Sequence, residues 1–284
     1  MSGSELSIPV VLLVLFAGVL HATWNAIAKA VRDKLVAFGL MSIAYTVAGA
    51  GALVLTGMPR HDAVVFAVAS AIIHIGYDLA LLQSYRLGAF GHAYPLARGT
   101  SPVLVGVGAW FFAGERLDAW ATAGVLTVAA GLISIVFVSG RLERKDLPAT
   151  LAAILTGCAI ACYSLVDGIG VRHAHNPAGY AALLFLLQGP PLLVIALVWR
   201  WGDPAWTSRR TAPAGVLAGL LSLAAYGIVI WAQTRGALAV VSALRETSVI
   251  TGAVIAALVF RETFGWRRLP AAVLVVTGIV LTQL

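Results

Sequence analysis

The chain has 284 residues, of which 60% are hydrophobic and 11% charged, and its mean hydropathy is +0.94. This composition lies outside the range of soluble globular domains and predicts an all-α polytopic membrane protein. The formal net charge is +7, from 19 Lys and Arg against 12 Asp and Glu.

Ten windows of about 20 apolar residues follow one another along the chain, each long enough to cross a hydrocarbon core of ~30 Å. They lie near residues 8–30, 36–57, 63–86, 89–113, 118–139, 149–171, 178–200, 213–235, 238–260 and 266–283. The first window has no Lys or Arg before it and no small-residue cleavage site after it, so we expect a membrane span rather than a removable signal peptide. We therefore predict ten transmembrane helices.

The basic residues are distributed unevenly between alternate loops, and cytoplasmic loops are the ones that retain Lys and Arg. With the N-terminus outside, the inner loops hold 13 of the 19 basic residues and the outer loops 4, while Arg98 and Arg245 lie within spans. We therefore predict a multi-pass protein of the bacterial inner membrane with both termini on the periplasmic side. This bias accounts for the net charge, which then indicates no nucleic acid partner.

Residues of the first half recur in the second half at a constant spacing of 147. Arg98, Thr100, Ser101, Glu115 and Gly131 correspond to Arg245, Thr247, Ser248, Glu262 and Gly278. Because each copy holds five spans, an odd number, the second copy must enter the membrane upside down. The sequence predicts two inverted five-helix repeats, at 1–140 and 149–284, joined by a basic cytoplasmic linker at 141–148. Such repeats build two exchangeable gates around one midplane site.

Charged side chains inside the spans are candidates for a functional site. Arg98 and Arg245 interrupt otherwise apolar segments, where a charge costs roughly 2.5–3.5 kcal/mol near a helix centre. The third span places His74, Tyr77 and Asp78 along one stripe at helical spacing, and such a stripe should face protein or water rather than lipid. A duplicated charge within the membrane is typical of a transport pathway.

The helices that open the two halves also match, at a spacing of 139. Gly18, Ala22, Trp24 and Asn25 correspond to Gly157, Ala161, Tyr163 and Ser164. With the segments LGAFGHAYPLARGTSPV, GERLD and AGVLTVAAGLI and their copies RGALAVVSALRETSVI, RETFGW and PAAVLVVTGIV, the chain resembles the drug/metabolite transporter superfamily, specifically its ten-helix EamA-type exporters. The resemblance covers nearly the whole chain. The second half departs from the first at Arg261, which replaces Gly114, and at Ser242, which replaces Pro95.

The resemblance implies a secondary transporter, with a central cavity between the halves, that exports amino acids or related metabolites. A zwitterionic substrate needs a cationic partner, an anionic partner and an apolar or aromatic wall. The residues that we predict to bind it are Trp24, His74, Tyr77, Asp78, Tyr94, Arg98, Tyr163, Tyr226, Arg245 and Ser248. Asp78, His74 and Asp167 are candidates for proton coupling.

The expected partners are a small-molecule substrate, aromatic or bulky apolar amino acids included, and the lipid bilayer. A monomer is sufficient, because one chain contains both halves. We expect no cofactor, no metal and no enzymatic activity.

Structural interpretations compete with these assignments. The arginines could form an intramembrane tie, either Arg98 with Asp78 or an arginine with backbone carbonyls at a kinked helix. The histidines and aromatic residues could be ordinary packing residues. Glu115 and Glu262 are predicted to be structural, since each follows a span and lies near basic residues and a helix start.

Other functions are also compatible with a polar pathway. An exporter of sugars, nucleotide precursors or organic cations would share this architecture, and a passive channel could use the same cavity, although no selectivity filter is visible. An intramembrane aspartyl protease would use Asp78 and Asp167 as a carboxyl pair. The sequence lacks the PAL segment and the glycine pattern that such proteases resemble, and a protease leaves the internal duplication unexplained.

Overall fold

The structure, a computed structural model, describes residues 6–87, 90–138, 147–259 and 269–284, with the backbone alone at 84–87, 90–95, 136–138, 149 and 256–257. Over these ranges the chain forms eleven α-helices, one 3₁₀ turn and no strand. The helices are α1 (Ile8–Ala30), α2 (Lys34–Thr56), α3 (His61–Leu87), α4 (Phe90–Phe112), α5 (Ala119–Val138), α6 (Leu147–Ala174), α7 (Pro177–Arg200), α8 (Thr211–Ala232), α9 (Leu238–Arg245), α10 (Ser248–Val259) and α11 (Leu269–Leu281). The 3₁₀ turn is η2 (Pro204–Trp206).

The helices are those of a membrane protein. Within the described ranges, seven segments are long and apolar enough to cross a bilayer when α9 and the start of α10 are counted as one, and two shorter apolar helices accompany them. Large apolar side chains cover the outside of the bundle, and Val54 and Leu55 are 86% and 87% exposed, as expected for a surface that faces lipid. The predicted class, an all-α polytopic membrane protein of about ten helices, is confirmed.

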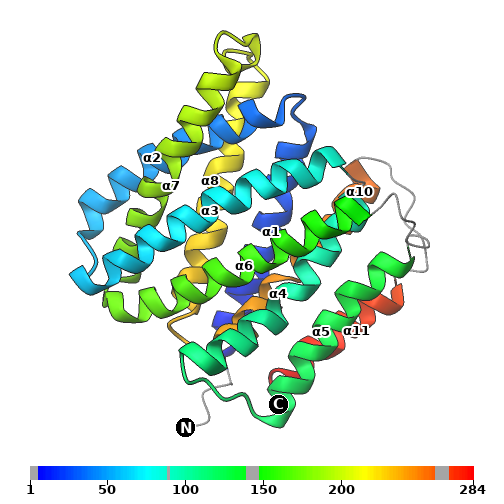
Figure 1. The fold of residues 1–284 in the computed structure, drawn as a ribbon. Helices are drawn as coiled ribbons and strands as arrows, with labels where there is room; N and C mark the ends of the chain where they lie inside the picture. Colours follow the sequence, from blue (N-terminus) through cyan, green and yellow to red (C-terminus); the bar gives the residue numbers. More distant parts are fainter. Residues whose placement is uncertain (1–5, 88–89, 139–146, 260–268) are drawn as a thin grey trace.

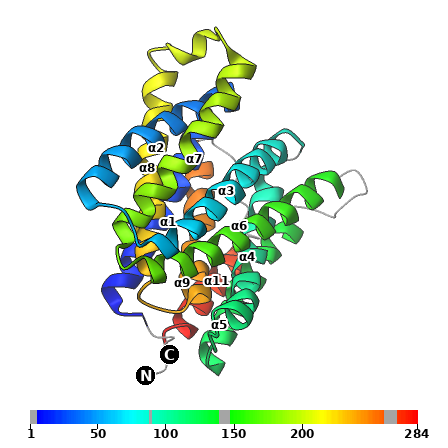
Figure 2. The ribbon, with the colours of Figure 1, turned by 60° about the vertical axis from the view of Figure 1, so that its left-hand side comes forward.

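The two halves pack against each other through matching helices. α2 lies against α7, α5 against α11, α3 against α6 and α1 against α8 (Figure 1, Figure 2). In chain order, α1, α2, α3 and α5 of the first half correspond to α6, α7, α8 and α11 of the second half. Exchanging each helix for its counterpart turns the α1–α8 contact into the α6–α3 contact and leaves the α2–α7 and α5–α11 contacts unchanged. The packing therefore has an approximate twofold relation between the halves.

The antiparallel α2–α7 pair shows this relation at its ends. Asp33 caps α2, accepting from the N–H groups of Leu35 and Val36, and its second carboxylate oxygen accepts from Arg200 Nε at 2.6 Å at the end of α7. Asn176 caps α7 and donates through Nδ2 to the carbonyl of Thr56 at the end of α2, at 2.7 Å. A side-chain cap of one helix thus holds the last turn of the other at both ends of the pair.

The predicted ninth span, 238–260, is interrupted. α9 ends at Arg245 and α10 begins at Ser248, and the N–H groups of Thr247, Val249 and Ile250 bond to carbonyls three residues back rather than four. The hydroxyl of Thr247 also donates to the Leu244 carbonyl at 2.7 Å. Such tightening in mid-helix is typical of a hinge, and it places Glu246 at the break.

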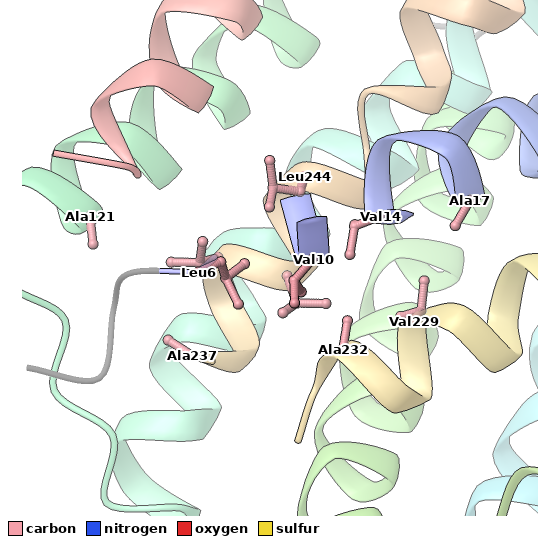
Figure 3. Close-up of a cluster of buried hydrophobic side chains, with 11 residues drawn as sticks. Leu6, Val10, Val14, Ala17, Ala121, Val229, Ala232, Ala237 and Leu244 are labelled. Atoms are coloured by element: carbon pink, nitrogen blue, oxygen red, sulfur yellow. The ribbon is translucent and has the colours of Figure 1, made fainter. Parts of the chain in front are cut away.

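A cluster of apolar side chains fills the bundle on the side where α1 begins. Figure 3 shows Val10 and Val14 of α1 beside Leu244 of α9 and Val229 near the end of α8. All four are at most 6% exposed. The cluster surrounds the first half of α1, whose start lies at the same end of the bundle as the end of α11 (Figure 1).

Candidate functional site

A small cavity lies in the interior of the bundle, between helices of both halves. Its lining comes from α1, α2, α3, α6, α7 and α8: His21, Trp24, Tyr45, His74, Tyr77, Asp78, Tyr163, Phe185, Gln188, Ser222 and Tyr226. The space open to the centres of water molecules is ≈ 30 Å³, and since one water needs roughly 10–15 Å³ on this measure, it holds about two waters. In this structure the cavity is therefore too small for an amino acid.

Aromatic rings form much of the cavity wall. The imidazole of His74 stacks on the ring of Tyr163 with centroids 4.0 Å apart. The ring of Tyr226 stands edge-on to both, at 5.2 Å from His74 and 5.6 Å from Tyr163. Six of the ten predicted binding residues line this cavity, namely Trp24, His74, Tyr77, Asp78, Tyr163 and Tyr226.

The two intramembrane arginines meet at a single carboxylate, which we call the Arg–Glu triad (Arg98, Arg245 and Glu246). Arg98 Nη1 donates to Glu246 Oε2 at 3.1 Å, while Arg245 Nη2 and Nε donate to Oε1 at 2.9 and 3.2 Å. All three residues are at most 2% exposed. With two guanidinium groups and one carboxylate, the triad carries a surplus positive charge inside the membrane.

Each arginine has a second contact beside the cavity. Arg245 Nη1 donates to Ser164 Oγ at 3.3 Å, and its guanidinium lies 5.8 Å from the ring centroid of Tyr163. Arg98 Nη2 contacts Nε2 of His21. Both arginines therefore lie behind the cavity wall and touch residues that form it.

One part of the cavity lining, the acidic pole (Asp78 and Gln188), contains a carboxylate. Asp78 is 7% exposed and accepts from Gln188 Nε2 at 3.4 Å. The other amide atom, Gln188 Oε1, is buried without a hydrogen-bond partner. A buried acceptor without a donor is costly, so Gln188 Oε1 is suited to accept a hydrogen bond from a donor group of a ligand.

Asp167 is held in a separate network. Its carboxylate accepts from Tyr180 Oη at 2.9 Å and from Tyr226 Oη at 2.5 Å, and a further bond comes from Ser70. Asp167 is fully buried and ties α6 to α3, α7 and α8. Because Tyr226 also lines the cavity, Asp167 orients part of the wall.

The remaining predicted binding residues lie elsewhere. Ser248 is fully buried at the start of α10, where its backbone lies against Gly18 of α1. The side chain of Tyr94 and the whole of Glu262 lie outside the described residues.

The sequence pattern suggested Asp78 as a possible ion-pair partner of Arg98, and this pairing is wrong. Glu246 takes that place, while Asp78 bonds to Gln188. Sequence reasoning missed Glu246 and Gln188 as site residues. Glu246 could have been found by the same criterion that identified the arginines, a charge inside an apolar span.

Glu115 has structural contacts, as its position after the fourth span suggested. Its Oε1 accepts from Arg172 Nη1 at 2.6 Å, and its Oε2 accepts from the backbone N–H of Leu238 at 2.9 Å. The helix start that it caps is that of α9, however, and its basic partner comes from α6. Glu115 thus joins the end of α4 to the second half.

Comparisons with known proteins concern the family and the fold. Residues 147–284 match the model of the family described as "EamA-like transporter family". None of the curated proteins compared with the chain matches it. A solved structure titled only "Crystal structure of protein" is 19% identical, with a TM-score of 0.78 over 97% of this chain and 98% of that chain. At this identity the likeness shows a shared fold and nothing more.

Proposed function

We propose that the chain, whose residues 147–284 match the model of the EamA-like transporter family, is a secondary active transporter that exports small zwitterionic metabolites, amino acids first among them. The observation that carries the proposal is the interior cavity between the halves, with an acidic pole at Asp78 and a surplus positive charge behind its other wall. A zwitterion has the complementary distribution of charge.

The acidic pole suits an ammonium group. Asp78 supplies a carboxylate, and Gln188 Oε1 supplies a buried acceptor that has no donor in this structure. A primary ammonium has three N–H donors and can satisfy both. Binding would then remove the cost of the unpaired amide oxygen, which supports a protonated amine as one end of the substrate.

The rest of the cavity suits the other parts of an amino acid. An aromatic wall for an apolar side chain is formed by Tyr77, Tyr163, Tyr226 and Trp24. Arg98 and Arg245 lie one residue behind this wall and favour a carboxylate electrostatically. On the same proposal, Ser248 and Tyr94 belong to the pathway in other states of the cycle.

The small volume of the cavity and the approximate twofold packing support alternating access as the mechanism. A substrate larger than two waters can enter only if the halves separate on one side, and exchange of the roles of the halves then opens the other side. The apolar cluster of Figure 3 would close the pathway on the side where α1 begins. The break at Glu246 provides a hinge near this cluster.

Proton coupling is proposed at Asp78. Asp167 is satisfied by hydroxyl donors from three helices, and His74 is bonded through Nδ1 to Ser70. Asp78 has one long bond and borders the cavity, so it can exchange a proton for the substrate ammonium as the cavity changes sides.

A passive channel is the second candidate from the same cavity, and sugars, nucleotide precursors or organic cations are alternative cargoes. A volume that holds about two waters favours a carrier. An aspartyl protease is disfavoured, because in the described part of the chain Asp78 and Asp167 are held by separate partners, Gln188 for the former and Tyr180, Tyr226 and Ser70 for the latter.

The test is counterflow in liposomes. Vesicles with purified protein are loaded with unlabelled amino acids, and entry of individual labelled amino acids is followed against empty liposomes. Transient accumulation that is lost in Asp78→Asn and retained in Asp62→Asn, a control at an exposed aspartate, is the expected result. No accumulation from folded protein would refute amino acid transport, and non-saturable equilibration would indicate a channel.

The proposed location is the bacterial inner membrane with both termini in the periplasm, on the basis of the loop charges. A cysteine at Ser2 should react with an impermeant thiol reagent in intact spheroplasts. The control is the same label on the parent chain, whose cysteines are Cys158 and Cys162. Labelling of the Ser2→Cys variant only after lysis would reverse the orientation.

A further inference from the structure

A groove lies on the outside of the bundle between α4 and α5, apart from the central cavity. The space open to the centres of water molecules is ≈ 610 Å³ there, against ≈ 30 Å³ in the central cavity, and ligand pockets generally measure about 300–1,000 Å³. α5 packs against α4, α9 and α11, and with α11 it forms one edge of the bundle (Figure 1). The groove is therefore large enough for a ligand and lies at the edge of the bundle.

The lining of the groove changes from apolar to polar along its length. Four aliphatic side chains form its inner part, namely Val103 and Val107 of α4 and Val125 and Leu126 of α5. Glu115 and Arg116, in the connection between the two helices, and Thr122, in the first turn of α5, line the other end. Such a lining suits an amphipathic ligand whose polar group lies beside the helix ends.

The length of the groove matches one leaflet of a bilayer. Val103 lies nine residues before Phe112, at which α4 ends, or ~14 Å along the helix axis at 1.5 Å per residue. Half of a hydrocarbon core of ~30 Å is ~15 Å. Trp110 and Trp120, both more than half exposed, lie near the same helix ends, as tryptophans do at membrane interfaces. The groove thus extends from the level of the headgroups to about the bilayer midplane.

Arg116 supplies a positive charge at the polar end. It is exposed, and both carboxylate oxygens of the adjacent Glu115 are engaged elsewhere, by Arg172 and by the backbone N–H of Leu238. A guanidinium pairs with a phosphate through two parallel hydrogen bonds. We infer that the groove between α4 and α5 binds a phospholipid, with one acyl chain along the aliphatic lining and the phosphate at Arg116.

The inner wall of the groove rests on α9. A Cβ at Gly106 would lie 3.4 Å from Cβ of Ala239, and Val125 belongs to the same buried cluster as Ala239 and Ala243. The acyl chain therefore lies one layer of side chains from the helix that ends at Arg245 of the Arg–Glu triad. Such a lipid would bind whatever cargo the central cavity accepts, and on the proposed orientation it belongs to the periplasmic leaflet.

The experiment measures binding of three probes to the delipidated protein in detergent by native mass spectrometry. Dioleoyl phosphatidylglycerol has acyl chains and a phosphate, dioleoylglycerol lacks the phosphate, and glycerol phosphate lacks the chains. We expect Arg116→Gln to weaken the phospholipid about tenfold or more, the loss of one hydrogen bond to a charged group, and to leave dioleoylglycerol unchanged. The matched control is Arg235→Gln, at an exposed arginine that lies over the ring of Trp231, and it should bind all three probes as the parent does.

A second pair of variants tests the aliphatic part. Val107→Trp places a large side chain in the groove at a position that is 51% exposed, so it should fold normally and weaken both the phospholipid and dioleoylglycerol. Leu104→Trp, at a 40% exposed leucine of α4 that does not line the groove, is the matched control and should bind as the parent does.

Three results would overturn the lipid site. Equal binding of the phospholipid to Arg116→Gln and Arg235→Gln would remove the phosphate from Arg116. Equal binding to Val107→Trp and Leu104→Trp would remove the acyl chain from the groove. Binding of glycerol phosphate as tightly as the phospholipid, with the same dependence on Arg116, would indicate a site for a soluble anion.

Discussion

The region of α4 around Arg98 corresponds to the region of the α9–α10 segment around Arg245. Among the differences between them, the residue that follows the arginine decides the charge of the Arg–Glu triad. The residue after Arg98 is Gly99, and the residue after Arg245 is Glu246. α4 continues through its arginine, whereas the second segment breaks there. The two arginines stand at corresponding positions of the halves, and the one carboxylate that serves both, Glu246, has no counterpart after Arg98.

The comparison also shows that each arginine contacts the first helix of its own half. α4 packs against α6 and α10 against α1, yet Arg98 contacts His21 of α1 and Arg245 donates to Ser164 of α6. Each arginine thus reaches the helix against which its counterpart segment packs. Because Arg98 of the first half donates to Glu246 of the second half, a movement of the halves relative to each other must rearrange the triad.

The largest effect is expected from Glu246→Gln, which leaves two buried guanidinium groups without an anion. Removing one partner of a buried ion pair costs about 3–5 kcal/mol, so the variant should unfold at a clearly lower temperature in detergent. The double variant Arg245→Gln/Glu246→Gln restores the net charge of the site and should recover part of the loss. Parent-like stability of Glu246→Gln would show that the triad does not depend on this carboxylate.

The fold was largely predictable from sequence, and the centre of the site was not. Apolar windows and the spacing of 147 are local and periodic signals, and they located the spans and the matching arginines. The pairing of Arg98 with Glu246 joins residues 148 positions apart, and the orphaned oxygen of Gln188 depends on the packing of α7 against α3. Such contacts arise from tertiary packing and leave no periodic trace.

The break in the ninth span was missed for a related reason. Residues 238–260 contain neither proline nor an excess of glycine, so intrinsic propensity favours one continuous helix. The break occurs where Glu246 must bring its carboxylate to two arginines and where the Thr247 hydroxyl bonds to the Leu244 carbonyl. Tertiary demand on one charged side chain therefore overrides local preference.

The next effect separates the two arginines by stability and by transport. Arg245→Ala loses bonds to Glu246 and to Ser164, and should cost about 1.5–3 kcal/mol, the range for a hydrogen bond to a charged group. Arg98→Ala leaves Glu246 paired with Arg245 and should remain folded, but it releases His21 and should reduce counterflow about tenfold or more.

Thermal unfolding and counterflow on the same preparations measure both quantities. We expect Arg245→Ala to be the less stable variant and Arg98→Ala to be the less active one relative to its folded fraction. Normal transport by a well-folded Arg98→Ala would remove Arg98 from the pathway and leave it as a structural tie. Equal losses in both assays would show that the two arginines are interchangeable and that the asymmetry of the triad has no functional consequence.

The smallest effect compares the glycines on which these segments pack. A Cβ at Gly157 of α6 would lie 2.2 Å from Thr100 Oγ1 and 2.7 Å from the Ala97 carbonyl oxygen, whereas one at Gly18 of α1 would lie 3.1 Å from Thr247 Oγ1. A threonine side chain can rotate away, but a backbone carbonyl of α4 cannot. Gly157→Ala should therefore cost about 1–2 kcal/mol, in the range for overpacking, and Gly18→Ala should cost less because the broken segment can adjust.

Gly227→Ala, where nothing lies within 4 Å, is the control for helix propensity and should be neutral or stabilising. If Gly18→Ala were the more destabilising of the pair in thermal unfolding, the α9–α10 segment would be the rigid member and the break at Glu246 would not act as a hinge.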